Sequence, residues 1–196
     1  SQDADLVQGQ KGHEFFALSA QERRTAGMPR IDTNIYAREN GWAIEAVATL
    51  YRATGDTRYL ERAVRAANWI IENRALDGGY RHGDASGDDL YLSDTLNMGR
   101  AFLELYRATG ERRWLAEATD AAATISTQFK AANAGFLSTP ASNSPIRPQP
   151  YIDENISATR LLNLLSHYTG DEEWRDAAEY GMRYLATDAV ALRRIE

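Results

Sequence analysis

Apolar side chains recur along most of the chain at the spacing of an α-helix that buries one face. Ile44, Val47, Ala48 and Tyr51 occupy positions i, i+3, i+4 and i+7, the pattern of a half-buried helix. The same stripe returns 55 residues later, at Gly99, Phe102, Leu103 and Tyr106. Because a whole helix face is repeated, the pattern predicts a repeating architecture.

A Thr-Gly pair follows each of these stripes and appears three times. The pairs are Thr54-Gly55, Thr109-Gly110 and Thr169-Gly170, and their glycines are 55 and 60 residues apart. Glycine at this position favours a left-handed helix C-cap, and the acidic residue after it suits the start of another helix. We therefore expect an all-α fold of three antiparallel helical hairpins.

The second helix of each hairpin carries one aromatic residue followed by small residues, which would let neighbouring helices approach closely. The first two units carry Tyr59, Ala63, Ala66, Ala67 and Ile70, and Trp114, Ala118, Ala121, Ala122 and Ile125. The third unit carries Trp174, Ala178, Gly181, Met182 and Leu185.

The chain is expected to divide into three parts. Residues 1–34 form an irregular leader in which Ser19 and Glu22 fit a capping box, so one short helix to about Ala26 is predicted. Residues 35–188 hold the three hairpins, and 189–196 form a truncated C-terminal tail. The chain is interpreted as a piece of a longer protein.

The connections between hairpins are long, roughly 76–92 and 131–152, and loops of this size inside a compact domain are usually functional. Antiparallel hairpins place the starts of the three first helices on one rim. Both long loops must return to that rim, while the Thr-Gly turns lie on the opposite one. Any functional site is therefore expected at the helix starts.

An acidic residue repeats at that rim, 16 positions before each turn glycine. These residues are Glu39, Asp94 and Glu154, and Asp153 lies beside the last of them. Two interpretations are open. The acids cap their helices and complement the helix dipole, worth roughly 0.3–1 kcal/mol each. Alternatively, they line a polar cleft and act as a general acid and base.

Aromatic and amide residues accompany the acids, and together these groups suit a sugar, through hydrogen bonds and ring stacking. The candidate ligand-binding residues are Tyr36, Asn40, Trp42, Tyr80, Tyr91, Asn97, Tyr151, Asp153 and Asn155. The alternative is that the aromatic rings only close a hydrophobic core.

His82 is the only one of three histidines in a long loop, so it is a candidate acid–base residue, with a solvated loop residue as the alternative. No metal or cofactor is expected, because no histidine lies beside the acids and Gly78-Gly79 lacks the context of a nucleotide-binding loop.

Composition narrows the classes of partner. The net charge is −6 with scattered basic residues, which argues against nucleic-acid binding. No apolar run approaches the 18 residues or so of a membrane span. Cysteine is absent, which excludes a disulfide or thiolate metal site in these residues and is compatible with a cytoplasmic location.

The leader Ser1–Asp5, the segment 29–34, and 36–42 followed by the Thr-Gly hairpins resemble the helical region of a large thioredoxin-like family that includes spermatogenesis-associated relatives. The resemblance covers nearly the whole chain. It implies an N-terminal thioredoxin-like domain before an α/α toroid similar to six-hairpin glycosidases and N-acylglucosamine 2-epimerases. Three hairpins would form half of such an (α/α)6 toroid, and the thioredoxin-like domain is missing here.

The leading hypothesis is a toroid fragment whose polar rim cleft binds or processes a carbohydrate-like ligand, acting, if catalytic, as a glycosidase-like hydrolase or a sugar epimerase or isomerase. The competing hypothesis is a non-catalytic scaffold or interaction domain for the missing thioredoxin-like domain. Open hairpin faces also suggest self-association. The expected partners are therefore a sugar-like molecule, the remainder of the full-length chain, and a second copy.

Overall fold

The computed structural model describes residues 12–27, 32–84, 87, 89–140 and 147–191. The chain divides into residues 1–34 and 35–196. The first unit contains α1 (Gly12–Ala17) and α2 (Ala20–Ala26). At the start of α2, Glu22 N donates to Ser19 Oγ and Ser19 N donates to Glu22 Oε2, so the predicted capping box and the helix that it starts are present. The prediction of one helix in the leader is wrong, because α1 precedes α2. The leader segment 1–5 and the tail 192–196 lie outside the described residues.

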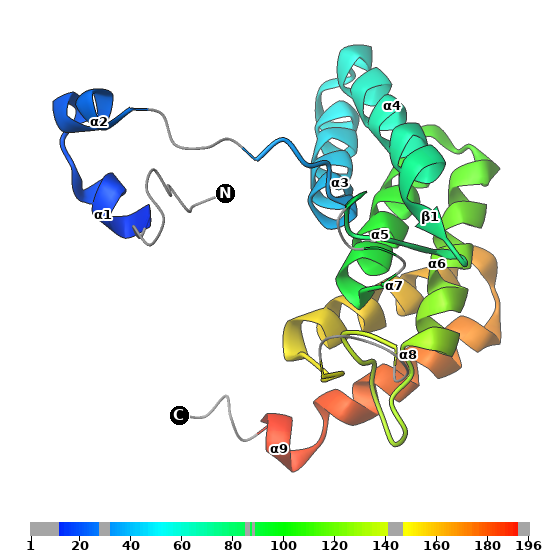
Figure 1. Cartoon of the computed structure of the whole chain (residues 1–196). Helices are drawn as coiled ribbons and strands as arrows, with labels where there is room; N and C mark the ends of the chain where they lie inside the picture. The colour runs from blue at the N-terminus through cyan, green and yellow to red at the C-terminus, as the bar shows by residue number, and fades with distance from the viewer. Residues whose placement is uncertain (1–11, 28–31, 85–86, 88, 141–146, 192–196) are drawn as a thin grey trace. The chain divides into compact units, whose positions relative to one another are not determined.

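Residues 35–196 contain the three predicted hairpins (Figure 1). They are α3 (Ala37–Thr54) with α4 (Thr57–Arg74), α5 (Leu92–Thr109) with α6 (Arg112–Gln128), and α7 (Ile152–Thr169) with α8 (Glu172–Leu185). A short α9 (Asp188–Ala191) follows. The predicted all-α hairpin fold is confirmed.

The Thr-Gly turns work in the same way in all three units. Each glycine adopts a left-handed conformation, with φ of 72°, 73° and 76°, which an L-residue with a side chain adopts only with strain. Each threonine hydroxyl donates to the helix carbonyl four residues earlier and accepts from the N–H two residues later. The turn therefore satisfies its polar groups locally, which explains why both residues recur.

Helix α5 is the centre of this unit. It packs against α3, α4, α6 and α7, so residues such as Met98 and Leu105 are fully buried. Small residues permit the close approaches: a Cβ added to Gly41 would lie 2.7 Å from the backbone carbon of Asn97. The predicted small-residue stripes of α4, α6 and α8 are buried at Ala67, Ala122 and Ala178.

One of the long connections holds structure that the periodicity did not predict. Strands β1 (Ala75–Leu76) and β2 (Gly79–Tyr80) form a small antiparallel hairpin. Its turn uses Asp77 and Gly78, both with positive φ. The hairpin places Tyr80 and the residues after it over the start of α5, because Tyr80 N donates to Thr95 Oγ1.

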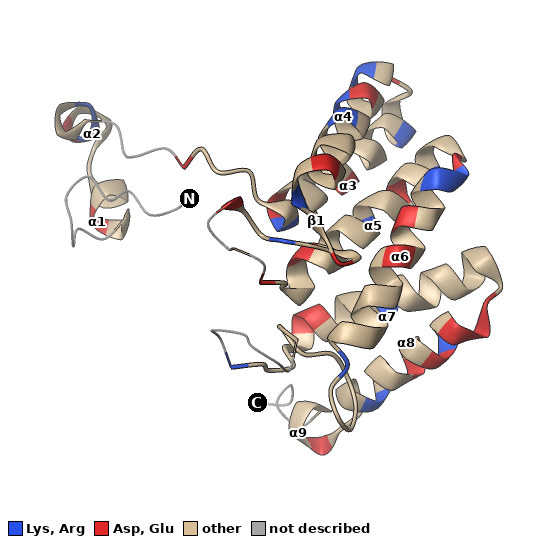
Figure 2. Cartoon of the chain, turned by 45° about the vertical axis from the view of Figure 1, so that its right-hand side comes forward, with Lys and Arg blue, Asp and Glu red and all other residues tan. Residues whose placement is uncertain are grey.

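Charged residues of both signs are intermingled over the helices (Figure 2). No helix within the described parts of the chain is both long enough and apolar enough to cross a membrane.

Candidate functional site at the helix starts

Helices α3, α5 and α7 all begin after a tyrosine in extended conformation. The three N-cap residues are Tyr36, Tyr91 and Tyr151, and none makes a side-chain capping hydrogen bond. The first-turn N–H groups of α3 and α5 find acceptors elsewhere in the chain. Ala37 N donates to His82 O at 3.0 Å, and Leu92 N donates to Ser138 O at 2.9 Å. The long loops therefore do return to the helix starts, which we call the helix-start end.

Asp94 connects two helices at this end. It is completely buried in the first turn of α5, and its Oδ1 accepts from the backbone N of Arg38 in α3 at 2.8 Å. The same oxygen lies 2.9 Å from His82 Nδ1. Asp94 thus caps the neighbouring helix and fixes a histidine ring. Its Oδ2 is buried and has no hydrogen-bond partner among the described residues.

His82 is enclosed on several sides. Its ring stacks on Tyr36, with centroids 4.4 Å apart and planes at 15°, and it meets Tyr91 edge-on. The hydrogen bond to Asp94 raises the pKa of His82, the charges of Asp94 and Glu39 act in the same direction, and burial and Arg38 oppose them. Because the carboxylate holds a proton on Nδ1, Nε2 is the nitrogen left for a ligand.

Glu39 forms a close pair with its neighbour Arg38, whose Nε and Nη2 donate to Glu39 Oε1 at 2.9 and 2.5 Å. The Arg38 guanidinium also lies over the ring of Trp42, 5.3 Å from its centroid. Glu39 Oε2 is buried, and no described residue bonds to it. Sequence reasoning missed Arg38, although it stands next to Glu39, because adjacent helical side chains seldom face each other.

Glu154, in the first turn of α7, has a strongly perturbed carboxyl group. Burial raises its pKa to about 7, the charges of Asp153 and Asp94 add to the rise, and Arg38 opposes it. Its Oε2 is also buried without a partner in the described chain. Asp153 beside it is exposed. Since Arg38 and Asp94 act on Glu154, and Glu39 acts on His82, the predicted acids share one electrostatic environment.

The amide residues have internal roles. Asn155 is completely buried; it accepts from Phe136 N and donates to the carbonyls of Phe136 and Tyr151. Asn97 accepts from Trp42 Nε1 at 2.7 Å and donates to a carbonyl of its own helix. Asn40 donates to Tyr36 O. These amides hold loops, rings and helix starts in place, and these internal contacts account for their presence without a ligand.

Of the five aromatic candidates, Tyr36 and Tyr91 pack against His82, and the other three separate into two groups. Tyr80 is buried and its hydroxyl donates to Glu117 on α6; burial and the nearby acids raise its pKa well above the ordinary range. By contrast, Trp42 and Tyr151 are 49% and 45% exposed, so a ligand can reach their rings. No three potential metal-ligating side chains converge anywhere in the described ranges.

Comparison with known proteins agrees with this architecture. A protein-family model described as the GH127 catalytic domain of β-L-arabinofuranosidase matches residues 39–146, more than half of the chain. The matched segment contains Glu39, His82 and Asp94 and ends before Glu154. A search of curated proteins found no match.

Several solved structures share the fold. One is a family 76 glycoside hydrolase (mannosidase) from Bacteroides thetaiotaomicron, with a TM-score of 0.65 and 18% identity over 77% of this chain and 44% of that one. A D-mannose isomerase gives a TM-score of 0.66 at 12% identity, over 78% and 45%. The third is a family 76 α-1,6-mannanase from Salegentibacter sp. HEL1_6, with a TM-score of 0.66 and 13% identity over 90% and 56%.

The last of these structures is an inactive variant with two adjacent aspartates replaced, in complex with α-1,6-mannotriose. This chain spans about half the length of each structure. Its three hairpins therefore correspond to part of an (α/α)6 toroid of the six-hairpin glycosidase type.

Proposed function

Because this chain belongs to the family described as the GH127 catalytic domain of β-L-arabinofuranosidases, we propose that its helix-start end binds and processes a carbohydrate. One observation carries the proposal. Glu39, Asp94 and Glu154 stand at equivalent positions of the three repeats, and each keeps one buried carboxyl oxygen without a partner in the described chain. Such an oxygen costs roughly 1–3 kcal/mol of folding free energy, so its retention calls for a functional explanation.

A sugar supplies what the Glu39 and Glu154 oxygens lack, since each of its hydroxyl groups donates a hydrogen bond. Trp42 and Tyr151 are exposed at the same end and offer apolar ring faces. Asp94 is fully buried, so it acts as a positioning residue that orients His82 and the start of α3. The groups proposed to contact the ligand are Glu39, His82, Glu154 and the two exposed rings.

Glycoside hydrolysis needs one protonated carboxyl group and one carboxylate on either side of the scissile bond. Glu154 is proposed as the general acid, because a pKa of about 7 keeps much of it protonated near neutral pH. Glu39 is proposed as the second carboxyl group, with its Oε1 taken by Arg38 and its Oε2 facing the ligand.

A second candidate is sugar isomerisation or epimerisation, which is favoured by the contact between His82 and Asp94. A histidine whose Nδ1 proton is held by a buried carboxylate can accept a proton at Nε2. One of the solved structures with this fold is a D-mannose isomerase. This candidate makes His82 the essential residue, whereas hydrolysis makes Glu154 essential.

The experiment is a thermal-shift and turnover screen with arabinofuranosides, α-mannosides and free hexoses. Replacements Glu154→Gln, Glu39→Gln and His82→Asn would each be compared with Glu173→Gln, an exposed acid in the first turn of α8. General acid–base catalysis is worth roughly 10²–10⁴-fold, so Glu154→Gln should lose at least a hundredfold in hydrolysis, with Glu173→Gln unchanged. Loss of isomerisation in His82→Asn alone would favour the second candidate.

The resemblance of the leader and hairpins to thioredoxin-like proteins supports a wider proposal, that the chain is the helical region of such a protein. In that case the non-catalytic alternative is a scaffold for the thioredoxin-like domain, and the open hairpin faces mediate self-association. If no sugar in the screen gives a thermal shift or turnover, and the chain dimerises in sedimentation experiments at micromolar concentration, the scaffold would be favoured.

A further inference from the structure

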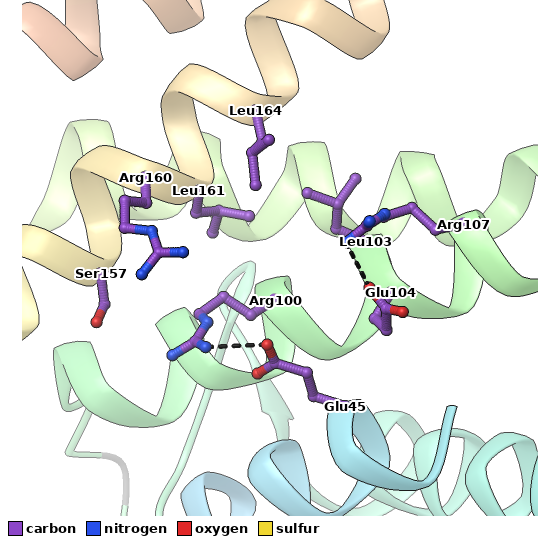
Figure 3. Close-up of a pocket in the computed structure, with 9 residues that line it drawn as sticks. All are labelled: Glu45, Arg100, Leu103, Glu104, Arg107, Ser157, Arg160, Leu161 and Leu164. Carbon is purple, nitrogen blue, oxygen red and sulfur yellow. Dashed lines mark hydrogen bonds and ion pairs between the residues drawn. The ribbon is translucent and has the colours of Figure 1, made fainter. Parts of the chain in front are cut away.

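A small pocket lies between α3, α5 and α7, on the side of α5 away from α6 (Figure 3). Its volume is about 120 Å³. Drug-sized ligands need roughly 300–1,000 Å³, so this pocket fits a single chemical group. The lining is mostly charged: three arginines, two glutamates, one serine and three leucines, namely Arg100, Arg107, Arg160, Glu45, Glu104, Ser157, Leu103, Leu161 and Leu164.

Repeat-equivalent residues pair across the wall formed by α3 and α5. Trp42 bonds to Asn97, Glu45 to Arg100 and Thr49 to Glu104, and each pair is separated by 55 residues. In the second of these pairs, an acid on α3 thus faces an arginine on α5, at 2.9 Å.

The wall formed by α5 and α7 lacks this complementarity. Sixty residues after Arg100 comes Arg160, and the position equivalent to Glu104 is Leu164. Figure 3 shows the Arg100 and Arg160 side chains extending from α5 and α7 toward the same space. Arg100 has Glu45 as a counter-ion, so the charge left to attract an anion is that of Arg160, whose side chain is exposed.

The acids of the pocket form ion pairs with arginines other than Arg160. Glu104 pairs with Arg52 at 2.6 Å and with Arg107 at 2.8 Å, and Glu45 pairs with Arg100. Arg160 makes no ion pair with any residue that the structure describes. The lining therefore carries one positive charge in excess, located on α7.

We propose that this pocket binds a phosphate-type oxyanion, held by the Arg160 and Arg100 guanidinium groups and the Ser157 hydroxyl. Guanidinium groups present paired donors that match the oxygens of such an anion. The pocket is separate from the proposed sugar site: Arg160 follows Glu154 by six residues, roughly 9 Å along the helix axis. The anion comes either free or as the phosphate of a small molecule.

The test is calorimetric titration of the chain with inorganic phosphate at low ionic strength. Arg160→Gln should weaken binding at least tenfold. Arg112→Gln removes the same charge from an exposed first-turn position of α6 and should change the dissociation constant less than twofold. Unchanged binding in Arg160→Gln, equal weakening by both replacements, or no binding to the wild-type chain would overturn the proposal.

Two further measurements are needed. The first distinguishes free phosphate from a phosphorylated small molecule, and the second distinguishes this pocket from the proposed sugar site. A hexose phosphate that binds more tightly than inorganic phosphate, with Arg160→Gln weakening both, would support a phosphorylated ligand; equal affinities would support the free anion. Glu154→Gln should leave phosphate binding unchanged even if it abolishes the response to neutral sugars. Loss of phosphate binding in Glu154→Gln would contradict a separate pocket.

Discussion

The two ends of the hairpin unit satisfy the polar groups of their helix termini in opposite ways. At the turn end, each threonine and glycine satisfies its polar groups within a few residues, and Asp171 accepts from Glu173 N within its own helix. At the helix-start end, Asp94 accepts instead from Arg38 N, 56 residues away. The first end is self-contained, whereas the second is held together by distant parts of the chain.

The difference shows where a ligand can be accommodated. No side-chain polar atom of the three Thr-Gly pairs is buried without a partner in the described chain, and near these turns only Trp114 Nε1, in the first turn of α6, is. The helix starts keep three such carboxyl oxygens, and a ligand that binds Glu39 and Glu154 can offset the stability cost of two of them. Replacements at the helix-start end should therefore affect both stability and binding, and replacements at the turn end should affect stability alone.

The largest contrast is expected between two aspartates. Asp94→Ala removes the acceptor of Arg38 N and of the His82 ring inside the protein, so we expect a loss of about 3 kcal/mol in unfolding free energy. Asp171→Ala removes an exposed N-cap and should cost about 1 kcal/mol. Urea denaturation of both variants measures the difference. Equal losses would show that the two ends do not differ in this respect.

Replacing a glycine by alanine should also cost different amounts of stability at the two ends. Gly41→Ala forces a methyl group against the backbone of Asn97 where α3 and α5 meet, and overpacking of this kind costs about 2 kcal/mol. Gly55→Ala meets no atom within 4 Å and is opposed only by its left-handed backbone conformation, at about 1 kcal/mol. Chemical denaturation should rank them in this order, and the reverse ranking would contradict the close approach of α3 and α5.

The pH dependence of stability should report on Glu154. Its pKa rises from 4.5 in the unfolded chain to about 7 in the folded one, so the folded state holds the proton more tightly. The contribution of Glu154 to stability is then most favourable below pH 4.5 and falls as the pH rises to 7 and above. We expect a fall of roughly 1–2 kcal/mol, below the full linkage value because the side chain is only partly buried.

Glu154→Gln should flatten this part of the profile and make the chain more stable than wild type above pH 7. His82 adds a change of the same sign at higher pH, because its raised pKa stabilises the folded state at low pH and this stabilisation is lost as the histidine deprotonates. His82→Gln separates the two contributions. An unchanged profile in Glu154→Gln would show that Glu154 is not the buried acid described here.

The smallest effect is expected at the turn threonines. Thr54→Val removes hydrogen bonds to Leu50 O and from Asp56 N in an exposed turn, and we expect a loss of about 0.5–1 kcal/mol. Sugar-induced thermal shifts should be unaffected by this replacement. A changed thermal shift would link the turn end to ligand binding and break the proposed division of roles.

The sequence predicted what depends on local patterns. The hairpins, their left-handed glycines and the capping box of Ser19 and Glu22 all follow from signals within a few residues, and repetition reinforced them. The three acids could be assigned to one rim because antiparallel hairpins leave no other arrangement.

The features of the candidate site that the sequence did not predict depend on contacts between distant segments. The position of Asn155 beside Glu154 predicts a ligand-binding amide, whereas its side chain holds the backbone of Phe136, 19 residues away. The bond between Asp94 and Arg38 depends on how α3 and α5 are aligned, which no local pattern specifies. Likewise, the high pKa of Glu154 comes from burial, which is known only after packing.

The most direct test of the central claim, that the ligand site is at the helix starts, is a chemical-shift titration of the ¹⁵N-labelled chain. L-arabinose, D-mannose and α-1,6-mannotriose would be added in turn. The turn glycines Gly55, Gly110 and Gly170 serve as internal controls at the opposite end. We expect the largest amide chemical-shift changes at Arg38, Glu39, His82 and Glu154, and no change at the three glycines. Largest shifts at the turn glycines, or no shift with any of these sugars, would contradict the account.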